Sequence, residues 1–342
     1  MENKRIIILG PVTTQNYFGG VANFDEELNE AFLRAGYESV IVTVQKDLIH
    51  QKEGNVKQCR SFFDVYKFIK SYSPRMVIAA LQYGAFFYIL PKNLKKIYVL
   101  HGFFDRVYYS HLKAILAPLY QKLVTLKADR VISNSYFTRM INNDFFNIQA
   151  DSVIHLGVAP EYLERASKET HFNKEKHSIL FAGRLIKSKR PLMLLKALNV
   201  LKEKKLDYIL YLAGNGEEKE NLLKYAQENG INMKYLGSLS HDDLYDYYKR
   251  SEVFVSLNDS EPMGIVFFEA VLLHCKIISP FTGGQVESLY DLPTNTRCFV
   301  DADSSESIAN GIEKMFLSSN DNLGPGNLDL SYEHVVKKFL EL

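Results

Sequence analysis

Residues 261–270 read Glu261-Pro262-Met263-Gly264-Ile265-Val266-Phe267-Phe268-Glu269-Ala270. Two carboxylates stand eight positions apart, with only a proline, a glycine and apolar residues between them, just after the apolar run 253–257. If a helix begins near Gly264, its rise per residue separates the carboxylates by on the order of 12 Å. The free N–H groups at the start of that helix then point at an anion. The stretch predicts a site for an elongated ligand with an anionic middle, which is the layout of sugar, diphosphate and ribose in a nucleotide sugar.

The composition favours a folded protein of two domains. The chain has 342 residues, of which 46% are hydrophobic, which is about right for two domains of roughly 150 residues. We find no run of about 18 apolar residues and no signal-peptide pattern. The three cysteines, Cys59, Cys275 and Cys298, are far apart and odd in number. We therefore expect a protein without a disulfide framework in the reducing cytoplasm, with the inner face of the plasma membrane as a second location.

Apolar strand-like runs alternate with helix-like stretches in two series. The first series comprises residues 5–9, 39–44, 76–79, 96–100, 130–132 and 152–154, and the second comprises 178–182, 208–213, 233–236, 253–257 and 276–279. Continuous apolar strands between helices predict parallel sheets that are covered on both faces. The expected fold is α/β, with two Rossmann-like doubly wound domains that face a cleft. We predict an N-terminal domain over 1–160, a polar linker over 161–177, a C-terminal domain over 178–330 and a terminal helix over 331–342.

A basic loop follows the first strand of the second series. Gly183 allows a sharp turn, and Arg184 and Lys189 then flank the loop at the carboxyl edge of the predicted sheet, where doubly wound sheets bind ligands. Arginine offers a planar fork to phosphate oxygens, and lysine offers a compact charge. A solvated basic loop is the alternative, but the downstream carboxylate pair favours phosphate binding.

With these motifs in place, the chain resembles the retaining glycosyltransferases of family 4, also called glycosyl transferases group 1, which have the GT-B fold. That family carries G-R-L-x-x-x-K-G, matched by Gly183, Arg184, Leu185 and Lys189, with Arg190 in place of the last glycine. Its E-x7-E signature is matched by Glu261 and Glu269. Further similar stretches follow in the family's order: 19–21, 99–102, 128–135, 153–158, 211–216, 235–237, 283–287 and 331–333. The resemblance spans nearly the whole chain and implies that the terminal helix crosses back onto the first domain.

The resemblance assigns roles to individual positions. Arg184 and Lys189 hold the donor diphosphate and offset the charge on the leaving group. Glu269 accepts hydrogen bonds from the ribose, and Glu261 contacts the donor sugar. The transferred sugar meets His101, for which an ordinary interior histidine is the alternative. Backbone amides cradle phosphate at Gly264, Ile265 and Val266 and, from the first domain, at Gly19 and Gly20, while Gly237 and Ser238 face the base.

Three departures from the family pattern are visible. Pro262 and Met263 replace a common Gly-Phe after the first glutamate, and Ala159 replaces a common aspartate. His274 stands where the family often has glycine, and we expect it to adopt the left-handed conformation. Asp301 and Asp303 form a D-x-D pair, which we interpret as a turn with capping acids rather than as a metal site. No divalent metal and no other cofactor is therefore expected.

Charge is uneven along the chain. Residues 1–160 contain 19 basic and 13 acidic residues, whereas the remainder contains 22 and 27. The segment 106–128 contains Arg106, Lys113, Lys122 and Lys127 but no acidic residue, and it includes Tyr108, Tyr109 and Tyr120. This segment is either a solvated basic helix face or a patch that contacts anionic lipid or a lipid-linked phosphate. Nothing indicates nucleic-acid binding.

The sequence thus predicts a retaining, metal-independent hexosyltransferase. It is expected to move a sugar from a nucleotide-diphosphate donor, most simply a UDP-sugar, to a saccharide or lipid-linked saccharide in bacterial surface polysaccharide or glycoconjugate assembly. Two alternatives stay open. One is a nucleotide-sugar epimerase of GT-B fold, which turns over its donor without an acceptor, and the other is a non-catalytic binding subunit of the same fold.

Overall fold

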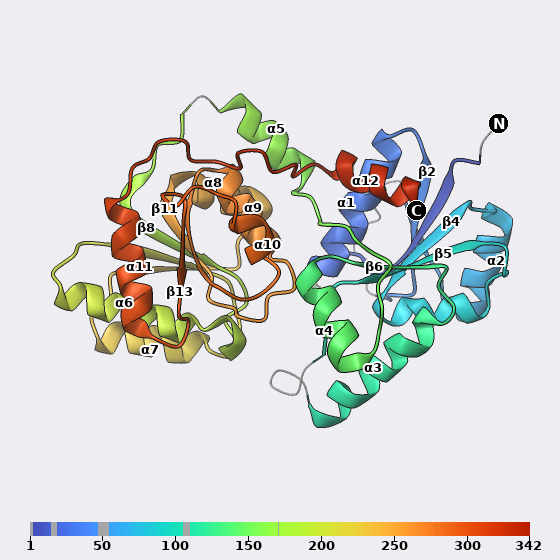
Figure 1. Ribbon diagram of the computed structural model, residues 1–342, viewed down its shortest axis with the longest axis horizontal. Helices are drawn as coiled ribbons and strands as arrows, with labels where there is room; N and C mark the ends of the chain where they lie inside the picture. Colours follow the sequence, from blue (N-terminus) through green and yellow to red (C-terminus); the bar gives the residue numbers. More distant parts are fainter. Residues whose placement is uncertain (1–2, 15–18, 47–54, 105–109, 170) are drawn as a thin grey trace. The chain divides into compact units, whose positions relative to one another are not determined.

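The computed structural model describes residues 3–14, 19–46, 55–104, 110–169 and 171–342. The chain divides into two compact units. Unit 1 comprises Met1–Pro160 with Leu330–Leu342, and unit 2 comprises Glu161–Asp329. Each unit is built around one parallel sheet (Figure 1).

Unit 1 contains a seven-stranded sheet in the order β3-β2-β1-β4-β5-β6-β7, and all of its pairs are parallel. The strands are β1 (Arg5–Leu9), β2 (Glu38–Thr43), β3 (Val56–Gln58), β4 (Met76–Ala80), β5 (Lys95–Leu100), β6 (Arg130–Ser133) and β7 (Ser152–Val153). The helices are α1 (Gly20–Arg34), α2 (Phe62–Tyr72), η1 (Leu81–Tyr88, of 3-10 type), α3 (His111–Thr125), α4 (Tyr136–Phe146) and α12 (Tyr332–Glu341).

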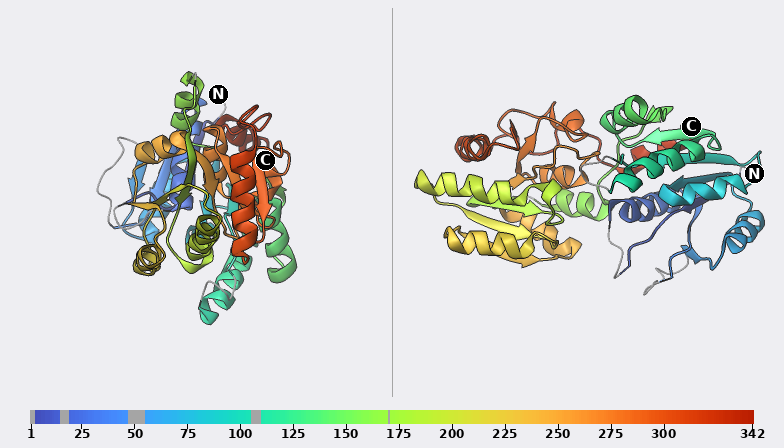
Figure 2. Two further views of the ribbon diagram at one scale, coloured as in Figure 1. Left: turned by 90° about the vertical axis from the view of Figure 1, so that its left-hand side faces the viewer. Right: turned by 90° about the horizontal axis from the view of Figure 1, so that it is seen from below.

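Alternate residues of these strands point to opposite faces of the sheet. Ile7 and Leu9 of β1 pack in one apolar cluster with Val65 and Ile69 of α2 and Val124 of α3. The residues that point to the opposite face, Ile6 and Ile8, are also fully buried. Both faces are therefore covered, as continuous apolar strands predict, and Figure 2 shows helices on each face.

The terminal helix α12 packs on α1. The rings of Tyr332 and Phe339 lie 6.5 and 6.4 Å from the ring of Phe24. Just before the helix, the Val158 amide donates to the Leu330 carbonyl at 2.8 Å. A side chain at Gly157 would collide with Tyr332 and with the Leu330 backbone. The last residues are thus part of unit 1, as the resemblance implied.

Unit 2 contains a six-stranded parallel sheet in the order β10-β9-β8-β11-β12-β13. The strands are β8 (Glu175–Ala182), β9 (Ile209–Ala213), β10 (Met233–Gly237), β11 (Ser251–Val255), β12 (Lys276–Pro280) and β13 (Arg297–Val300). The helices are α5 (Pro160–Lys168), η2 (Lys187–Lys189), α6 (Pro191–Glu203), α7 (Lys219–Glu228), α8 (His241–Arg250), α9 (Ile265–Leu272), α10 (Val286–Leu289) and α11 (Ser305–Leu317). Leucines 194, 195 and 198 of α6 share a buried cluster with Ile308 and Ile312 of α11. The predicted fold class, two doubly wound α/β domains with a C-terminal helix on the first, is confirmed.

The structure differs from the prediction at residues 161–177, for which we expected a linker. Helix α5 spans Pro160–Lys168, and β8 already begins at Glu175. The polar sequence hides one buried anchor, Tyr162, whose hydroxyl donates to the His241 carbonyl at 2.7 Å. Arg165 adds an ion pair of 2.6 Å with Asp242 of α8. The described residues of this stretch are therefore held by contacts within unit 2 that its own composition does not reveal.

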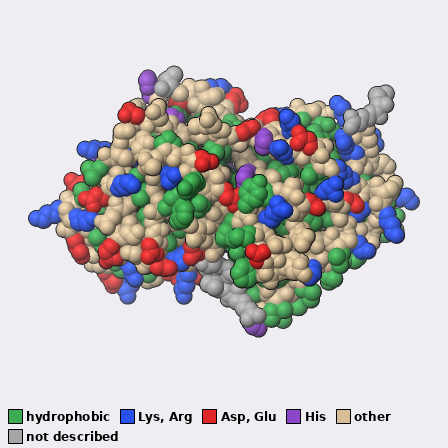
Figure 3. All heavy atoms as spheres, viewed as in Figure 1, with side chains coloured by type: hydrophobic (Ala, Val, Ile, Leu, Met, Phe, Trp, Pro, Cys, Tyr) green, Lys and Arg blue, Asp and Glu red, His purple; other side chains and the backbone are tan. Residues whose placement is uncertain are grey.

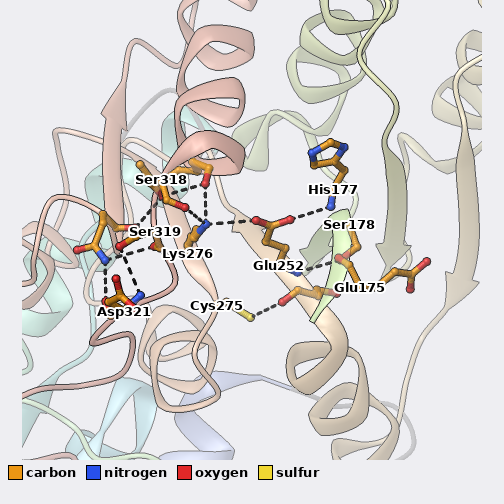
Figure 4. A network of polar contacts seen from close by, with 12 residues as sticks. Glu175, His177, Ser178, Glu252, Cys275, Lys276, Ser318, Ser319 and Asp321 are labelled. Carbon is orange, nitrogen blue, oxygen red and sulfur yellow. Dashed lines mark hydrogen bonds and ion pairs between the residues drawn. The ribbon is translucent and has the colours of Figure 1, made fainter. Parts of the chain in front are cut away.

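A buried ion pair lies at the other end of the unit 2 sheet, away from the strands' carboxyl ends (Figure 4). The ammonium of Lys276, at the start of β12, lies 3.2 Å from the carboxylate of Glu252 on β11, and both side chains are buried. Lys276 also donates to the carbonyls of Met315 and Ser318 at 2.8 and 2.9 Å. Glu252 accepts from the His177 amide at 2.7 Å. Each buried charge is thus paired and hydrogen-bonded.

Candidate functional site

The carboxyl ends of β8, β9 and β10 are joined through their loops. Gly183 donates to the Ala213 carbonyl at 3.1 Å, and Gly214 donates to the Gly237 carbonyl at 2.7 Å. A Cβ at Gly214 would lie 1.8 Å from the Gly183 carbonyl oxygen, and Gly214 has a φ of +131°. Glycine is needed there because the two loops touch through their backbones. These backbone contacts hold the loop that follows β8 in place.

Arg184 and Lys189 both lie in the loop that follows β8. Arg184 is exposed, whereas the side chain of Lys189 is 20% exposed and its ammonium pairs with the carboxylate of Glu261. Leu185, between them, is fully buried and anchors the loop in the apolar core. The structure therefore brings Lys189 and Glu261 together, although 72 positions separate them.

Arg190 is a structural residue that the sequence interpretation missed. It occupies the place of the family's glycine and has the left-handed φ of +50° that a glycine adopts easily. Its guanidinium pairs with Asp259 at 2.7 Å and with Asp303 at 3.2 Å, and it donates to the Leu257 carbonyl. These contacts offset the backbone strain. The signal in the sequence was the family's glycine at this position, which indicates a left-handed backbone conformation.

Glu261 is held as a charged carboxylate. Its side chain is 14% exposed, and it accepts from the Lys189 ammonium and, at 2.9 Å, from the Asn258 amide. Burial disfavours the charge, but the cation of Lys189, these two hydrogen bonds and the more distant Arg184 outweigh it and lower the pKa of Glu261. The Glu261 carbonyl accepts from the Gly284 amide at 2.8 Å, which fixes the backbone as well.

Helix α9 begins at Ile265, directly after Gly264, as predicted. Gly264 has a φ of +81°, and a Cβ there would lie 2.7 Å from the Phe267 ring and 3.0 Å from the Glu261 side chain. No side chain of the described residues caps this N-terminus. The first amides of a helix carry partial positive charge and lack partners within the helix. The amides of Gly264, Ile265 and Val266 thus suit an anion beside Glu261.

Glu269, one turn further along α9, has a different environment. Its carboxylate accepts from the Tyr248 hydroxyl at 3.1 Å. Burial raises the pKa of Glu269 to about 7, although the Tyr248 hydrogen bond opposes the shift. The Tyr248 side chain is fully buried and packs on Phe254. The two carboxylates of the motif are therefore chemically unlike: Glu261 is firmly ionised, and Glu269 titrates near neutrality.

Gly237 ends β10 and Ser238 follows it, at the same edge of the sheet. Gly237 has a φ of +70°, and a Cβ there would meet nothing within 4 Å among the described residues. Ser238 is exposed. Their position at the end of the strand is compatible with the predicted contact to a base.

Unit 1 places its predicted residues at the carboxyl edge of its own sheet. Gly19 caps the N-terminus of α1, and neither Gly19 nor Gly20 would bring a Cβ within 4 Å of another described residue. His101 follows β5, with its ring 4.7 Å from the Phe24 ring. Burial lowers the pKa of His101 to about 4, so the imidazole is neutral at pH 7. Its Nε2 is buried and has no hydrogen-bond partner among the described residues, which is unusual for an ordinary interior histidine.

Two further predictions concern His274 and the pair of Asp301 and Asp303. His274 has the expected left-handed φ of +61° and stacks on Phe172 at 4.2 Å. Asp301 accepts from the Asp303 amide at 2.9 Å, and Asp303 pairs with Arg190, so this pair belongs to a turn before α11. In the described part of the chain, no group of three or more His, Cys, Asp or Glu residues could hold a metal. Arg106, Tyr108 and Tyr109 lie outside the described residues.

Asn258 and Tyr248 also belong to the site, and the sequence interpretation missed them. Asn258 follows β11 and orients Glu261, while Tyr248 ends α8 and contacts Glu269. Asn258 lies three positions before Glu261, which was the available signal. Nothing local marks Tyr248, which lies 21 positions from its partner.

Comparisons with known proteins agree with this geometry. Residues 164–324 match the family model of glycosyl transferases group 1. An O-antigen biosynthesis glycosyltransferase of Escherichia coli is 28% identical over 198 residues, which cover 57% of this chain and 54% of the relative. An α-1,4-N-acetyl-D-galactosaminyltransferase of Campylobacter jejuni, whose name includes an undecaprenol-linked saccharide, is 24% identical over 53% of this chain and 51% of its own length. The chain thus spans about half the length of these curated relatives.

Among solved structures, Anabaena HepE in complex with UDP and glucose superposes with a TM-score of 0.74 at 16% identity, covering 99% of both chains. This likeness extends over both units and shows the fold. The family-model match lies within unit 2, and the two-sheet architecture that the chain shares with HepE is the GT-B fold.

Proposed function

We propose that the protein is a retaining hexosyltransferase that uses a nucleotide-diphosphate sugar, most simply a UDP-sugar. The observation that carries this proposal is the pair of unlike carboxylates on either side of a helix N-terminus without a side-chain cap. Glu261 is ionised and paired with Lys189 before the helix begins. Glu269 lies within α9, beyond the free amides of its N-terminus. The bound UDP and glucose of HepE support the choice of donor.

In this proposal the donor's diphosphate lies on the α9 amides and forms ion pairs with Arg184 and Lys189. These cations stabilise the negative charge that grows on the leaving phosphate. The sugar passes through an oxocarbenium-like transition state, and the leaving phosphate accepts the proton of the acceptor hydroxyl on the same face. Glu269 binds the ribose, and Glu261, held by Asn258, contacts the donor sugar. No residue is assigned as a covalent nucleophile, and no metal is required.

Residues of unit 1, together with Gly237 and Ser238 of unit 2, supply the remaining groups in the same proposal. The neutral His101 imidazole, with its unpartnered Nε2, contacts the transferred sugar. The amides of Gly19 and Gly20 add to phosphate binding, and the backbone at Gly237 and Ser238 faces the base. The printed names of the relatives favour a saccharide or lipid-linked saccharide acceptor in surface polysaccharide assembly.

The stereochemistry of the product tests the retaining assignment. A screen of UDP-, GDP-, ADP- and dTDP-sugars by thermal shift first finds the donor, because a ligand at about 100 times its Kd stabilises the native state by about 2.7 kcal/mol. With an α-linked donor from this screen and a saccharide acceptor, we expect NMR to show an α-linked product. A β-linked product contradicts the retaining mechanism, and donor turnover to a second nucleotide sugar without acceptor indicates the epimerase instead.

Donor affinity should depend on pH through Glu269. The ribose hydroxyls donate to the ionised carboxylate, and the pKa of free Glu269 is raised to about 7. The fraction ionised therefore rises with pH across this value, and we expect the Kd of the UDP-sugar to fall about tenfold from pH 6 to pH 8. Isothermal titration calorimetry measures this Kd. A UDP-sugar is used rather than UDP, because the diphosphate of a UDP-sugar does not titrate between pH 6 and pH 8.

Glu269→Gln is the matched control for this titration, since it keeps the size of the side chain and cannot ionise. Its affinity should be weak and flat between pH 6 and pH 8. A wild-type affinity that is equally flat argues against ribose recognition by Glu269.

A further inference from the structure

Helix α3 of unit 1 presents an apolar stripe to the outside. Five of its residues are 45–66% exposed, and Leu126, just after its end, is 71% exposed. These six residues are Leu112, Ile115, Leu116, Leu119, Leu123 and Leu126. With 3.6 residues per turn they fall within roughly 100° of arc. In Figure 3 hydrophobic side chains gather along the lower edge, where α3 lies in Figure 1.

This stripe is not the face that packs on unit 1. Ala114, Pro118, Gln121 and Val124 are buried on the other side of the same helix, and Val124 belongs to the core cluster. A helix that buries one face and exposes leucines over four turns on the other has an unpartnered surface. Contiguous apolar patches of this kind mark sites of interaction with proteins or membranes.

The residues beside the stripe are basic and aromatic. Lys122 lies on one side of it, and Lys113 and Lys127 lie on the other. Tyr88, itself 50% exposed, donates to the Leu123 carbonyl at 2.8 Å and lies under the Lys127 ammonium at 5.3 Å. From 110 to 128 the chain has no acidic residue. The exposed face of α3 is therefore apolar, and the lysines border it.

We propose that α3 docks this protein on the surface of a membrane that contains anionic lipids. The leucine stripe enters the boundary between headgroups and acyl chains, while the lysines and Tyr88 meet the headgroups, as in interfacial amphipathic helices. Charge complementarity favours this occupant over a second copy of the chain. Two α3 helices face to face would bring the lysine rows of both copies together without an acid between them. The docking does not depend on the proposed transfer reaction.

The chain contains no tryptophan, so a single introduced indole reports on its own surroundings. We choose Leu119→Trp on the stripe and, as matched control, Leu317→Trp at the end of α11 in unit 2, where Leu317 is 82% exposed. Vesicles of phosphatidylcholine and phosphatidylglycerol in equal parts are compared with pure phosphatidylcholine. We expect the Leu119→Trp emission to shift to the blue with the mixed vesicles and the Leu317→Trp emission to stay unchanged.

Sedimentation of the otherwise unaltered chain gives the second measurement. We expect it to pellet with mixed vesicles, and we expect Leu116→Ser/Leu119→Ser to bind at least tenfold more weakly with an unchanged circular dichroism spectrum. Lys122→Gln/Lys127→Gln should lose the preference for the anionic vesicles. The proposal is overturned if the chain stays in the supernatant with mixed vesicles. It is equally overturned if the serine variant binds as well, or if that variant instead converts a dimer to a monomer.

Discussion

We expect Lys189→Ala to lower kcat/KM for the proposed glycosyl transfer by at least about 100-fold. Removing one preorganised charge that stabilises a developing anion typically costs about two to three orders of magnitude. Here the loss is compounded, because Lys189 is the cation that holds the buried carboxylate of Glu261 in its ionised form. Steady-state kinetics with the donor found by thermal shift measures the effect, and donor titration reports the accompanying loss of affinity.

Lys187→Ala is the matched control for this prediction. Lys187 belongs to the same short 3-10 turn, carries the same charge and is exposed. Because its charge is screened by solvent, we expect its kcat/KM to stay within about threefold of the unaltered chain. If the two variants behave alike, Lys189 has no special place in the reaction.

We expect Lys276→Met to destabilise unit 2 by about 3–5 kcal/mol, the usual loss when one partner of a buried ion pair is removed. The substitution leaves Glu252 buried without its cation and takes the donor away from the carbonyls of Met315 and Ser318. Urea unfolding followed by far-UV circular dichroism measures the free energy of unfolding. The transition assigned to unit 2 is the one that should shift.

The double variant Lys276→Met/Glu252→Gln separates the uncompensated charge from lost packing. Glutamine keeps an acceptor for the His177 amide, which donates to Glu252 at 2.7 Å. We expect the double variant to recover more than half of the lost stability, since no buried charge then remains. A Lys276→Met variant within about 1 kcal/mol of the unaltered chain would show that the pair adds little.

Much of the fold could be predicted from the pattern of apolar runs. The runs at 5–9 and 76–79 are β1 and the core of β4, which pair in a parallel sheet. The short edge strand β3 at Val56–Gln58 was missed because it is largely exposed and polar. Helix α5 was taken for a linker, because the residue that anchors it, Tyr162, finds its partner 79 positions away.

The sequence by itself determined the parallel α/β architecture, the two series of strands and the position of the E-x7-E helix. Those features depend on local periodicity and on glycines with required backbone conformations, such as Gly264. Tertiary structure alone decided that Lys189 pairs with Glu261, that Tyr248 touches Glu269 and that the leucines of α3 face outward. Each of these depends on which distant segments of the chain pack together, and sequence periodicity does not reveal this.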